Sequence, residues 1–539
     1  MIKKRIFCVV TIILLLPALF LHGCLLTMAP VETSPEIEEP PPPPAEPTGN
    51  PVREPPEAGQ FTLRYDSAST MNPITSLNRD HILLSSLMYE SLFTLDSSLN
   101  VSTALCESWS TADSVTYEFV LKPDIAMRDG SYLTADDVVY TLRQAMQTGR
   151  FVNRLEVIRN ISTDSDLTVT IMLKSPNSRF IRLLDVPIIK DGSIDDHIPP
   201  GTGPYVFSGT GRTARLTRFP RHRDYDRLPV SVIHLIECDD NEVMELFDGG
   251  ELSLLWDDPS GAFNIRFNRL NEPRYYDTTA LQYIGFNTRT VVLYNHDVRR
   301  AIGCAIDRNY IANKIMPGQT VPAPLALSPV YRWYDPQWEE RDIDPLIEMS
   351  ALLVFVGLED FDSDSYLEYP DGFGGFFEFT LDFIVNSENA YKVQAAHRIA
   401  DALRRTGFDI VVRELPWENF KIALQTGDFD MYYGEILLSA DFDLSPLLLP
   451  ESSINYGRTG SSSFFPLIEN FLSAQTAFEE RETAKHLCEE IRMYAPFVPI
   501  LYKKYAIFTP IGAVTGASPS QSGVFYGFTD WTIDMTMLS

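Results

Sequence analysis

The order of apolar segments between residues 381 and 437 limits the possible folds more than any other feature of this sequence. Short apolar segments alternate there with longer segments whose apolar residues recur at helical spacing. The order is strand, helix, strand, helix, strand: LDFIVNS (381–387), AYKVQAAHRIADALRRTG (390–407), FDIVVREL (408–415), WENFKIALQTG (417–427) and FDMYYGEIL (429–437). Two strands joined by a helix in this way form a right-handed parallel unit. We therefore expect a mostly parallel sheet in this part of the chain.

The region before residue 200 has a different pattern, in which apolar and polar residues alternate. FTLRY (61–65), TYEFVLK (116–122) and LTVTIMLK (167–174) each place their apolar side chains on one face. Such strands are typical of antiparallel sheets with one buried face. A chain of 539 residues is too long for a single compact core. We therefore expect an α/β protein with roughly two to four domains.

Two further segments predict local structure. DVRRAIGCAIDRNYIANKI (297–315) has an apolar stripe at helical spacing, and Asp297 is expected to be the N-cap of this helix. The glycine-rich DGFGGFFEF (371–379) is expected to be a turn between strands, since it lacks the form of a phosphate-binding loop.

The stretch RDGSYLTADDVVY (128–140) contains three aspartates, Asp129, Asp136 and Asp137. Carboxylates this close can be an acid/base pair or half of a metal site, or they can start a helix. Asp129-Gly130 has the composition of a turn, and Thr134 and Asp137 have the spacing of a capping box. The pattern therefore favours structural roles for all three aspartates over catalysis.

The N-terminus has the features of an export signal. Basic residues at positions 3–5 precede an apolar run that ends near Leu21 and is interrupted by Pro17, which makes it short for a membrane span. The sequence Leu21-His22-Gly23-Cys24 resembles the lipobox of bacterial lipoproteins, although His22 departs from it. Ordinary signal cleavage and an uncleaved anchor are the alternatives. We expect residues 1–23 to be a lipoprotein signal peptide, Cys24 to carry the lipid, and residues 24–58 to be a Pro/Glu-rich tether.

Charge and motifs exclude several classes of function. The formal net charge of −29 argues against nucleic-acid binding, because phosphate contacts need clustered lysine and arginine. No HExxH, GxSxG or GxGxxG motif is present, and the eight histidines are scattered. We therefore expect no enzymatic activity, no bound metal and no cofactor. The widely spaced Cys106, Cys238, Cys304 and Cys488 are expected to be buried thiols, with disulfide pairing as the alternative.

Several segments, in the same order, resemble the peptide/nickel-type extracellular solute-binding proteins of ABC transporters, family 5. YEFVLKPDIAMRDGSYLTADDVVYTLRQA (117–145) resembles the signature of that family, although Met127-Arg128 departs from it. The segments at 208–275 and 452–470 match poorly. The other segments that match are TMNPIT (70–75), YESLFTLDSSLNVSTALCESW (89–109), GTGPYVF (201–207), IGFNTRT (284–290), DVRRAIGCAIDR (297–308), ALLVFVGL (351–358) and GDFD (427–430).

The resemblance implies a two-lobed periplasmic-binding-protein type II fold with an extra inserted small domain, which closes on its ligand like a clamp. Lobe one would combine a main domain (59–93, 197–275 and 509–539) with the inserted small domain (94–196). Lobe two would be residues 276–508.

The resemblance also implies a function and site residues. Family members of the peptide type bind a peptide between the lobes and hold its free amine with an aspartate. Asp441 is expected in that role and Asp443 is the alternative, although a solvated loop aspartate is also compatible with the pattern. Asn72, Trp417 and Tyr433 are weaker candidates for the pocket wall, and Trp417 can equally belong to the core.

The expected partners are a peptide ligand, the transmembrane subunits of an ABC permease with their ATPase subunits, and the membrane through the lipid anchor. We expect a monomer on the extracytoplasmic face of the cell membrane, periplasmic or at the cell surface. The alternatives are the same fold with a nickel chelate, sugar or opine as ligand, or a sensor or adhesion lipoprotein that does not transport.

Overall fold

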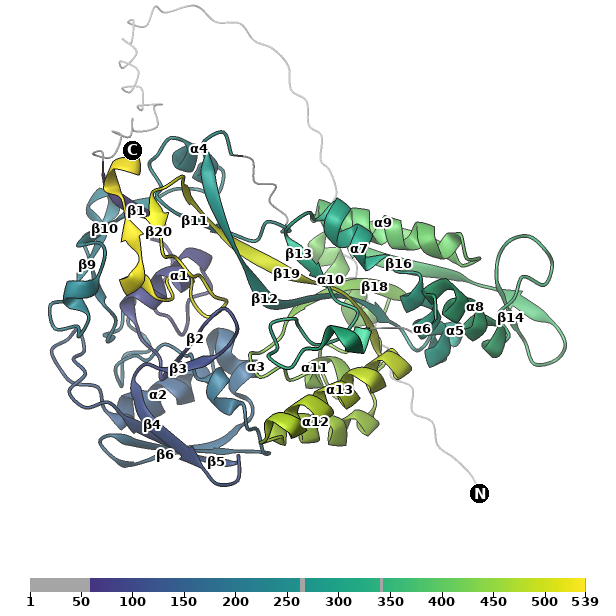
Figure 1. The fold of residues 1–539 in the computed structure, drawn as a ribbon, viewed down its shortest axis with the longest axis horizontal. Coiled ribbons are helices and arrows are strands. Elements are labelled where there is room, and N and C mark those ends of the chain that lie inside the picture. The colour runs from purple at the N-terminus through teal and green to yellow at the C-terminus, as the bar shows by residue number, and fades with distance from the viewer. Residues whose placement is uncertain (1–58, 262–266, 340–342, 539) are drawn as a thin grey trace, which may run out of the picture. The chain divides into compact units, whose positions relative to one another are not determined.

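The computed structural model describes residues 59–261, 267–339 and 343–538 (Figure 1). All of these residues belong to one compact unit, Pro55–Ser539. The predicted signal peptide, Cys24 and the whole predicted tether lie outside the described residues, so these predictions stay open. Within the described ranges, no helix is both long enough and apolar enough to cross a membrane.

The first sheet is built from segments that are far apart in the sequence. Its order is β1-β10-β9-β8, with β1 parallel to β10 and the other pairs antiparallel. Phe61 and Leu63 of β1 are buried, which confirms the strand expected at 61–65. Near this sheet lie the helices α1 (Arg79–Met88) and α4 (Val243–Asp248). The strands are β1 (Phe61–Tyr65), β8 (Tyr205–Ser208), β9 (Arg215–Arg218) and β10 (Val232–Glu237).

The second sheet is antiparallel and has the order β4-β5-β7-β6. Tyr117 and Phe119 on β5 face Ile171 and Val169 on β7, and all four side chains are fully buried. Glu118 between them is exposed. The expectation of strands with one buried face is therefore confirmed. The elements are β4 (Cys106–Thr111), β5 (Thr116–Leu121), β6 (Ile158–Ser165), β7 (Thr168–Leu173), α2 (Ala135–Ala145) and α3 (Val152–Leu155), with the small pair β2 (Phe93–Leu95) and β3 (Val101–Thr103) nearby.

The aspartates of residues 128–140 have the structural roles that the sequence predicts. The carboxylate of Asp137 accepts hydrogen bonds from the amide and the hydroxyl of Thr134, at 2.8 and 3.0 Å. Asp129 accepts the amide and hydroxyl of Ser131 in the preceding turn. Asp137 is also fully buried and forms an ion pair with Lys190 at 3.1 Å. The sequence did not reveal this buried ion pair.

The third sheet contains the predicted strand-helix-strand units. Strand β16 is parallel to both β17 and β18, and α9 and α10 connect these strands as expected. The rest of the sheet is antiparallel, so the prediction of a mostly parallel sheet is wrong. The elements are β11 (Leu255–Asp257), β12 (Asn271–Phe286), β16 (Thr380–Asn386), α9 (Ala390–Arg404), β17 (Asp409–Leu415), α10 (Trp417–Thr426), β18 (Met431–Leu437) and β19 (Phe497–Pro510).

Hydrophobic cores cover both faces of this sheet. Met431 and Tyr433 of β18 lie in one core and Tyr432 lies in the other, because successive side chains of a strand point to opposite faces. Figure 1 shows α9 on one side of the sheet and α12 and α13 on the other. The remaining elements are α5 (Val291–Tyr294), α6 (His296–Cys304), α7 (Arg308–Tyr310), β13 (Thr320–Pro322), α8 (Pro345–Val356), β14 (Glu368–Pro370), β15 (Phe376–Glu378), α11 (Ser445–Leu448), α12 (Phe465–Ser473), α13 (Ala477–Tyr494), β20 (Val514–Thr515) and β21 (Thr532–Ile533).

The segment 297–315 differs from its prediction. Helix α6 begins at His296 and ends at Cys304, and Asn295 is its N-cap, because its side chain accepts the amide of Asp297 at 2.9 Å. Asp297 is therefore a first-turn residue and not the N-cap. Asp307 caps a separate short helix, so the predicted single helix is interrupted.

Two other predictions are confirmed. Strands β14 and β15 are joined by the glycine-rich segment at 371–375, as expected for a turn. The side chains of Cys106, Cys238, Cys304 and Cys488 are buried, and none of these four residues forms a disulfide.

Two long strands connect the cores of the predicted lobes. The core around the first and second sheets is one continuous cluster, as expected for a lobe with an inserted domain. Strands β12 and β19 pair from Asn271/Pro510 to Gly285/Phe497, with a register shift near Asp277. The predicted boundaries at 275/276 and 508/509 fall inside these strands. The domain limits themselves stay a prediction.

Candidate functional site

The loop after β18 holds the first candidate residue, Asp441, in a fixed position. Its side chain is 1% exposed and accepts hydrogen bonds from the Ser439 hydroxyl at 2.5 Å and from the Asn177 side-chain amide at 2.8 Å. Phe442 has a φ of 60°, so the chain turns sharply directly after Asp441. Asn177 belongs to the predicted small domain and Asp441 to predicted lobe two. This hydrogen bond therefore connects the two parts that a clamp would bring together.

Asp443 lies beside Asp441 and has an altered affinity for protons. Its carboxylate accepts hydrogen bonds from the amide and the hydroxyl of Ser445, at 2.8 and 2.5 Å. Burial and, to a smaller extent, the adjacent Asp441 carboxylate together raise the pKa of Asp443 to about 6. Two acidic groups that repel each other in a partly buried place attract a proton or a cationic group.

Two arginines of the predicted small domain lie near this pair of carboxylates, and Arg179 is buried whereas Arg154 is half-buried. Arg179 is 3% exposed and donates to the backbone carbonyl of Asp441 at 3.2 Å and to that of Phe471. Arg154 pairs with Asp185. Burial lowers the pKa of Arg179 and lowers the pKa of Arg154 to about 10. A guanidinium group nevertheless stays charged at neutral pH. Acidic and basic groups therefore meet at this junction.

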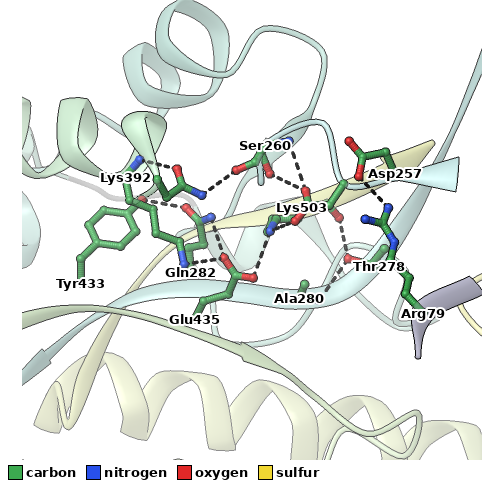
Figure 2. A network of polar contacts seen from close by, with 12 residues as sticks. Arg79, Asp257, Ser260, Thr278, Ala280, Gln282, Lys392, Tyr433, Glu435 and Lys503 are labelled. Atoms are coloured by element: carbon green, nitrogen blue, oxygen red, sulfur yellow. Dashed lines mark hydrogen bonds and ion pairs between the residues drawn. The ribbon is translucent and has the colours of Figure 1, made fainter. Parts of the chain in front are cut away.

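A second polar network crosses the long strands β12 and β19 (Figure 2). At its centre the Lys503 ammonium is 2% exposed and pairs with Asp258 and, at 3.0 Å, with Glu435. Lys392 at the start of α9 pairs with the other oxygen of Glu435 at 2.9 Å. Burial alone would raise the pKa of Glu435, but the two lysines lower it to about 2. Glu435 is therefore an anion at any physiological pH.

This network also joins segments of the two predicted lobes. The side-chain amide of Asn389, the N-cap of α9, donates to the Ser260 carbonyl at 2.9 Å. Arg79 of α1 pairs with Asp257 at 2.6 Å on the same segment (Figure 2). Burial raises the pKa of Asp257, and Arg79 opposes this rise. The segment 257–260 is thus held from α1 on one side and from α9 on the other.

A cavity of about 790 Å³ opens beside the long strands. Its volume is in the range of pockets that hold small organic ligands. Tyr331 and Arg332 line it, and Tyr331 stacks edge-on against Phe442, next to Asp441. Segments from both predicted lobes contribute to the wall. They are 97–100, 274–277, 329–334 and 517–519.

The structure brings together only some of the candidate residues. Tyr433 is buried and donates to Gln282 at 2.8 Å, and Gln282 donates to Glu435, so Tyr433 belongs to the Lys503 network (Figure 2). Asn72 is fully buried, and its side chain holds the carbonyls of Ile194 and Asp196, which is a structural role. Trp417 is 44% exposed and stacks on Phe420 of α10. Within the described ranges, neither Asn72 nor Trp417 has a hydrogen bond or ring contact with the carboxylate pair.

Several residues of the junction were missed by sequence reasoning. Lys503 is the clearest, because a lysine inside the apolar strand FVPILYKKYAIF (497–508) is a visible signal of a buried ion pair. Asn177 and Arg179 give no such signal, since polar residues after a proline are common in loops. Asp441 and Asp443 do not belong to any group of three or more metal-binding side chains within the described residues.

The sequence matches a family of known proteins over more than half of its length. The model of "Bacterial extracellular solute-binding proteins, family 5 Middle" matches residues 100–452. The oligopeptide-binding protein AppA of Bacillus subtilis is 24% identical over 364 residues, which are 62% of this chain and 65% of AppA. The glutathione-binding protein GsiB of Escherichia coli is 23% identical over 465 residues, which are 81% of this chain and 87% of GsiB. The chain thus spans just under two thirds of AppA.

Solved structures share the fold. AppA from Bacillus subtilis in complex with a nonapeptide has a TM-score of 0.65 at 18% identity, over 89% of this chain and 100% of that one. NikZ from Campylobacter jejuni in complex with Ni(L-His) has a TM-score of 0.65 at 17% identity, over 88% of this chain and 100% of that one. The expected two-lobed α/β fold is therefore confirmed. At such identities the likeness establishes the fold and leaves the ligand open.

Proposed function

Since the chain belongs to the bacterial extracellular solute-binding proteins of family 5, we propose that it captures peptides outside the cytoplasm and delivers them to an ABC permease. In this proposal the protein is a monomer held on the membrane by a lipid on Cys24. Residues 59–275 with 509–539 form lobe one and residues 276–508 form lobe two. The lobes close around the ligand by bending at β12 and β19.

The observation that carries this proposal is the carboxylate pair of Asp441 and Asp443 opposite the charged side chains of Arg154 and Arg179. A free peptide has an ammonium group at one end and a carboxylate at the other. A junction that presents both signs of charge can attract both ends, whereas a neutral sugar has no charge to pair with either sign. The nonapeptide bound to the related fold of AppA supports the same class of ligand.

Asn177 has a defined part in this proposal. Its amide donates to Asp441 at 2.8 Å and occupies the place that a ligand ammonium would take. An ammonium makes a charge-assisted hydrogen bond, which is about twice as strong as that of a neutral amide. The ligand would therefore displace Asn177 from Asp441. When no ligand is bound, the hydrogen bond between Asn177 and Asp441 would hold the two lobes together.

Native mass spectrometry of residues 59–539, purified from rich medium, tests the proposal. We expect adducts of a few hundred to roughly one thousand daltons that are released by mild unfolding, as is typical of a buried peptide ligand. Sequencing of the released molecules should give peptides with free amino termini. The Asp441→Asn variant should lose most of these adducts, because one charge-assisted hydrogen bond corresponds to about tenfold or more in affinity.

A matched control is Asp239→Asn, which removes one exposed acidic group elsewhere on the chain and should leave the adducts unchanged. Asn177→Ala should retain peptides at least as well as the natural chain. Retention of peptides by Asp441→Asn at the natural level would contradict the role of Asp441.

Adducts with the isotope pattern of nickel would instead support a metal chelate as ligand, as in NikZ. If cells without the protein lose peptide uptake, the protein is a component of a transporter, whereas unchanged uptake would favour a sensor.

A further inference from the structure

A group of four carboxylates lies in the loop between α8 and β14, outside the junction described above. Asp360, Asp362 and Asp364 are exposed, whereas Glu368 is completely buried. One oxygen from each carboxylate lies within 4.8 Å of the others. Within the described residues, none of these carboxylates forms an ion pair with a lysine, arginine or histidine. Their mutual repulsion therefore has no compensating cation among the described side chains.

The carboxylate of Glu368 gives the independent indication of a ligand. Its Oε2 accepts the amide of Phe361 at 2.7 Å, but its Oε1 is buried and has no hydrogen-bond partner. A buried carboxylate oxygen without a partner is strongly unfavourable. This oxygen belongs to the residue that closes the group of aspartates, so a cation bound among them would supply the missing partner.

The loop is held in a shape that directs the aspartates toward one place. Asp360 accepts the amides of Ser363 at 2.7 Å and Ser365 at 3.1 Å, and Asp364 accepts the amide of Tyr366 at 2.8 Å. Ser365 has a φ of 82°, a conformation that usually requires glycine. The spacing Asp-x-Asp-x-Asp followed by a left-handed residue is that of the first half of a twelve-residue calcium loop.

We propose that Asp360, Asp362, Asp364 and Glu368 bind a calcium ion. Only oxygen ligands are present in this group, and these favour a hard cation over zinc or nickel. Calcium accepts six to eight oxygens at about 2.3–2.6 Å, so oxygens on opposite sides of it lie roughly 5 Å apart. All four oxygens lie within 4.8 Å of one another, so one calcium ion can contact all of them. Water and backbone carbonyls complete the coordination.

The ion would brace the sheet of lobe two. The amide of Leu367, next to Glu368, donates to the carbonyl of Gly407 at 2.8 Å, in the turn between α9 and β17. Leu358 and Leu367, which flank the loop, pack against the core on the α9 side of the sheet. Figure 1 shows β14 beside the end of α8. Calcium binding would therefore fix this loop against the parallel part of the sheet and leave the ligand junction untouched.

Isothermal titration of the full chain in mild detergent, first stripped of metal with EGTA, tests the proposal. We expect one calcium ion per chain with a dissociation constant between about 1 µM and 1 mM, and at least tenfold weaker binding of magnesium. Saturating calcium should raise the melting temperature by about 3 °C. Glu368→Gln keeps the size of the side chain and its hydrogen bond from Phe361, and should weaken calcium binding at least tenfold.

Asp362→Asn should also weaken calcium binding at least tenfold. Because residue 362 is exposed, this variant is expected to fold, so it tests the proposal even if Glu368→Gln does not fold. The matched control is Glu359→Gln, an exposed acidic residue of the same loop that is not a member of the group, and it should bind calcium like the natural chain. Absence of calcium binding up to 10 mM, which is roughly ten times the weakest affinity expected of such sites, would overturn the proposal. So would equal binding of magnesium, or natural affinity in both variants of the group.

Discussion

Asp137 and Glu368 are both completely buried carboxylates near clusters of aspartates, yet their surroundings differ. Both oxygens of Asp137 have partners, which are the amide and hydroxyl of Thr134, the amide of Asp191 and the ammonium of Lys190. Glu368 has one amide for one oxygen and no partner for the other. Acidic residues at close spacing therefore do not by themselves indicate a ligand. A buried carboxylate whose two oxygens both have protein partners indicates a structural role, whereas one with an unpartnered oxygen indicates a binding site.

Glu435 is a third carboxylate to compare, because its partners are two ammonium groups, the buried Lys503 and the half-buried Lys392. Removal of Lys503 leaves Glu435 and Asp258 without their shared ammonium. We expect Lys503→Met to lower the free energy of unfolding by about 3–5 kcal/mol, as is typical when one partner of a buried ion pair is removed. Urea denaturation at pH 7 measures this change. Lys504→Met is the matched control, since Lys504 lies next in the same strand but its side chain is 29% exposed, and it should cost less than about 1 kcal/mol. Similar effects of both substitutions would refute the central position of Lys503.

The second largest effect is expected at Asp137. Asp137→Ala removes the acceptor for buried amides and the partner of Lys190, and it should lower the free energy of unfolding by about 3 kcal/mol. The loss should be the same with EGTA and with calcium, unlike any loss at Glu368. The exposed neighbour Asp136 serves as control, because Asp136→Asn should cost less than about 0.5 kcal/mol. If the loss of stability in Asp137→Ala depended on calcium, the distinction drawn between Asp137 and Glu368 would be wrong.

Asp443 is a partly buried carboxylate, and its effect on stability should depend on pH. Its pKa of about 6 in the folded chain lies above the ordinary value, so the folded chain binds the proton more tightly than the unfolded chain. This group therefore adds stability as the pH falls from 7 toward 5, by about 1 kcal/mol, and that addition is lost as the pH rises through 6. Unfolding curves of the natural chain and of Asp443→Asn at both pH values measure the difference. If the two chains change equally with pH, the assignment to Asp443 is wrong.

The smallest effect is expected at Asp129, which is exposed and accepts hydrogen bonds only from Ser131 of its own turn. Asp129→Asn can still accept both hydrogen bonds, so the free energy of unfolding should change by less than about 0.5 kcal/mol. Calcium affinity should not change either. Thermal unfolding with and without calcium checks both expectations, and a shift of several degrees in either condition would count against a purely local role.

Sequence reasoning succeeded where the interactions are local. The unit β16-α9-β17 and the capping box at Thr134 each depend on residues close together in the chain. It failed at Asp297 because Asn295, two residues earlier, competes successfully for the cap. It also failed for the sheet as a whole, because the pairing of β12 with β19 joins segments that are more than 200 residues apart and leaves no periodic signal.

The candidate site shows the same division. The position of Asp441 followed from a resemblance in the sequence, but its partner Asn177 is 264 positions away and could not be predicted. The spacing of Asp360, Asp362 and Asp364 is visible in the sequence, whereas the unpartnered oxygen of Glu368 depends on three-dimensional burial. Side-chain chemistry is readable from the sequence, and the partners of a buried side chain are not.

The four buried cysteines offer a way to follow each region of the molecule separately. Cys106 lies in the second sheet, Cys238 near the long strands, and Cys304 and Cys488 in the cores of the third sheet. Burial raises the pKa of Cys106 to about 11 and of Cys488 to about 12, so neither thiol reacts while its surroundings stay closed. The rate at which each thiol is alkylated therefore reports how often its own region opens.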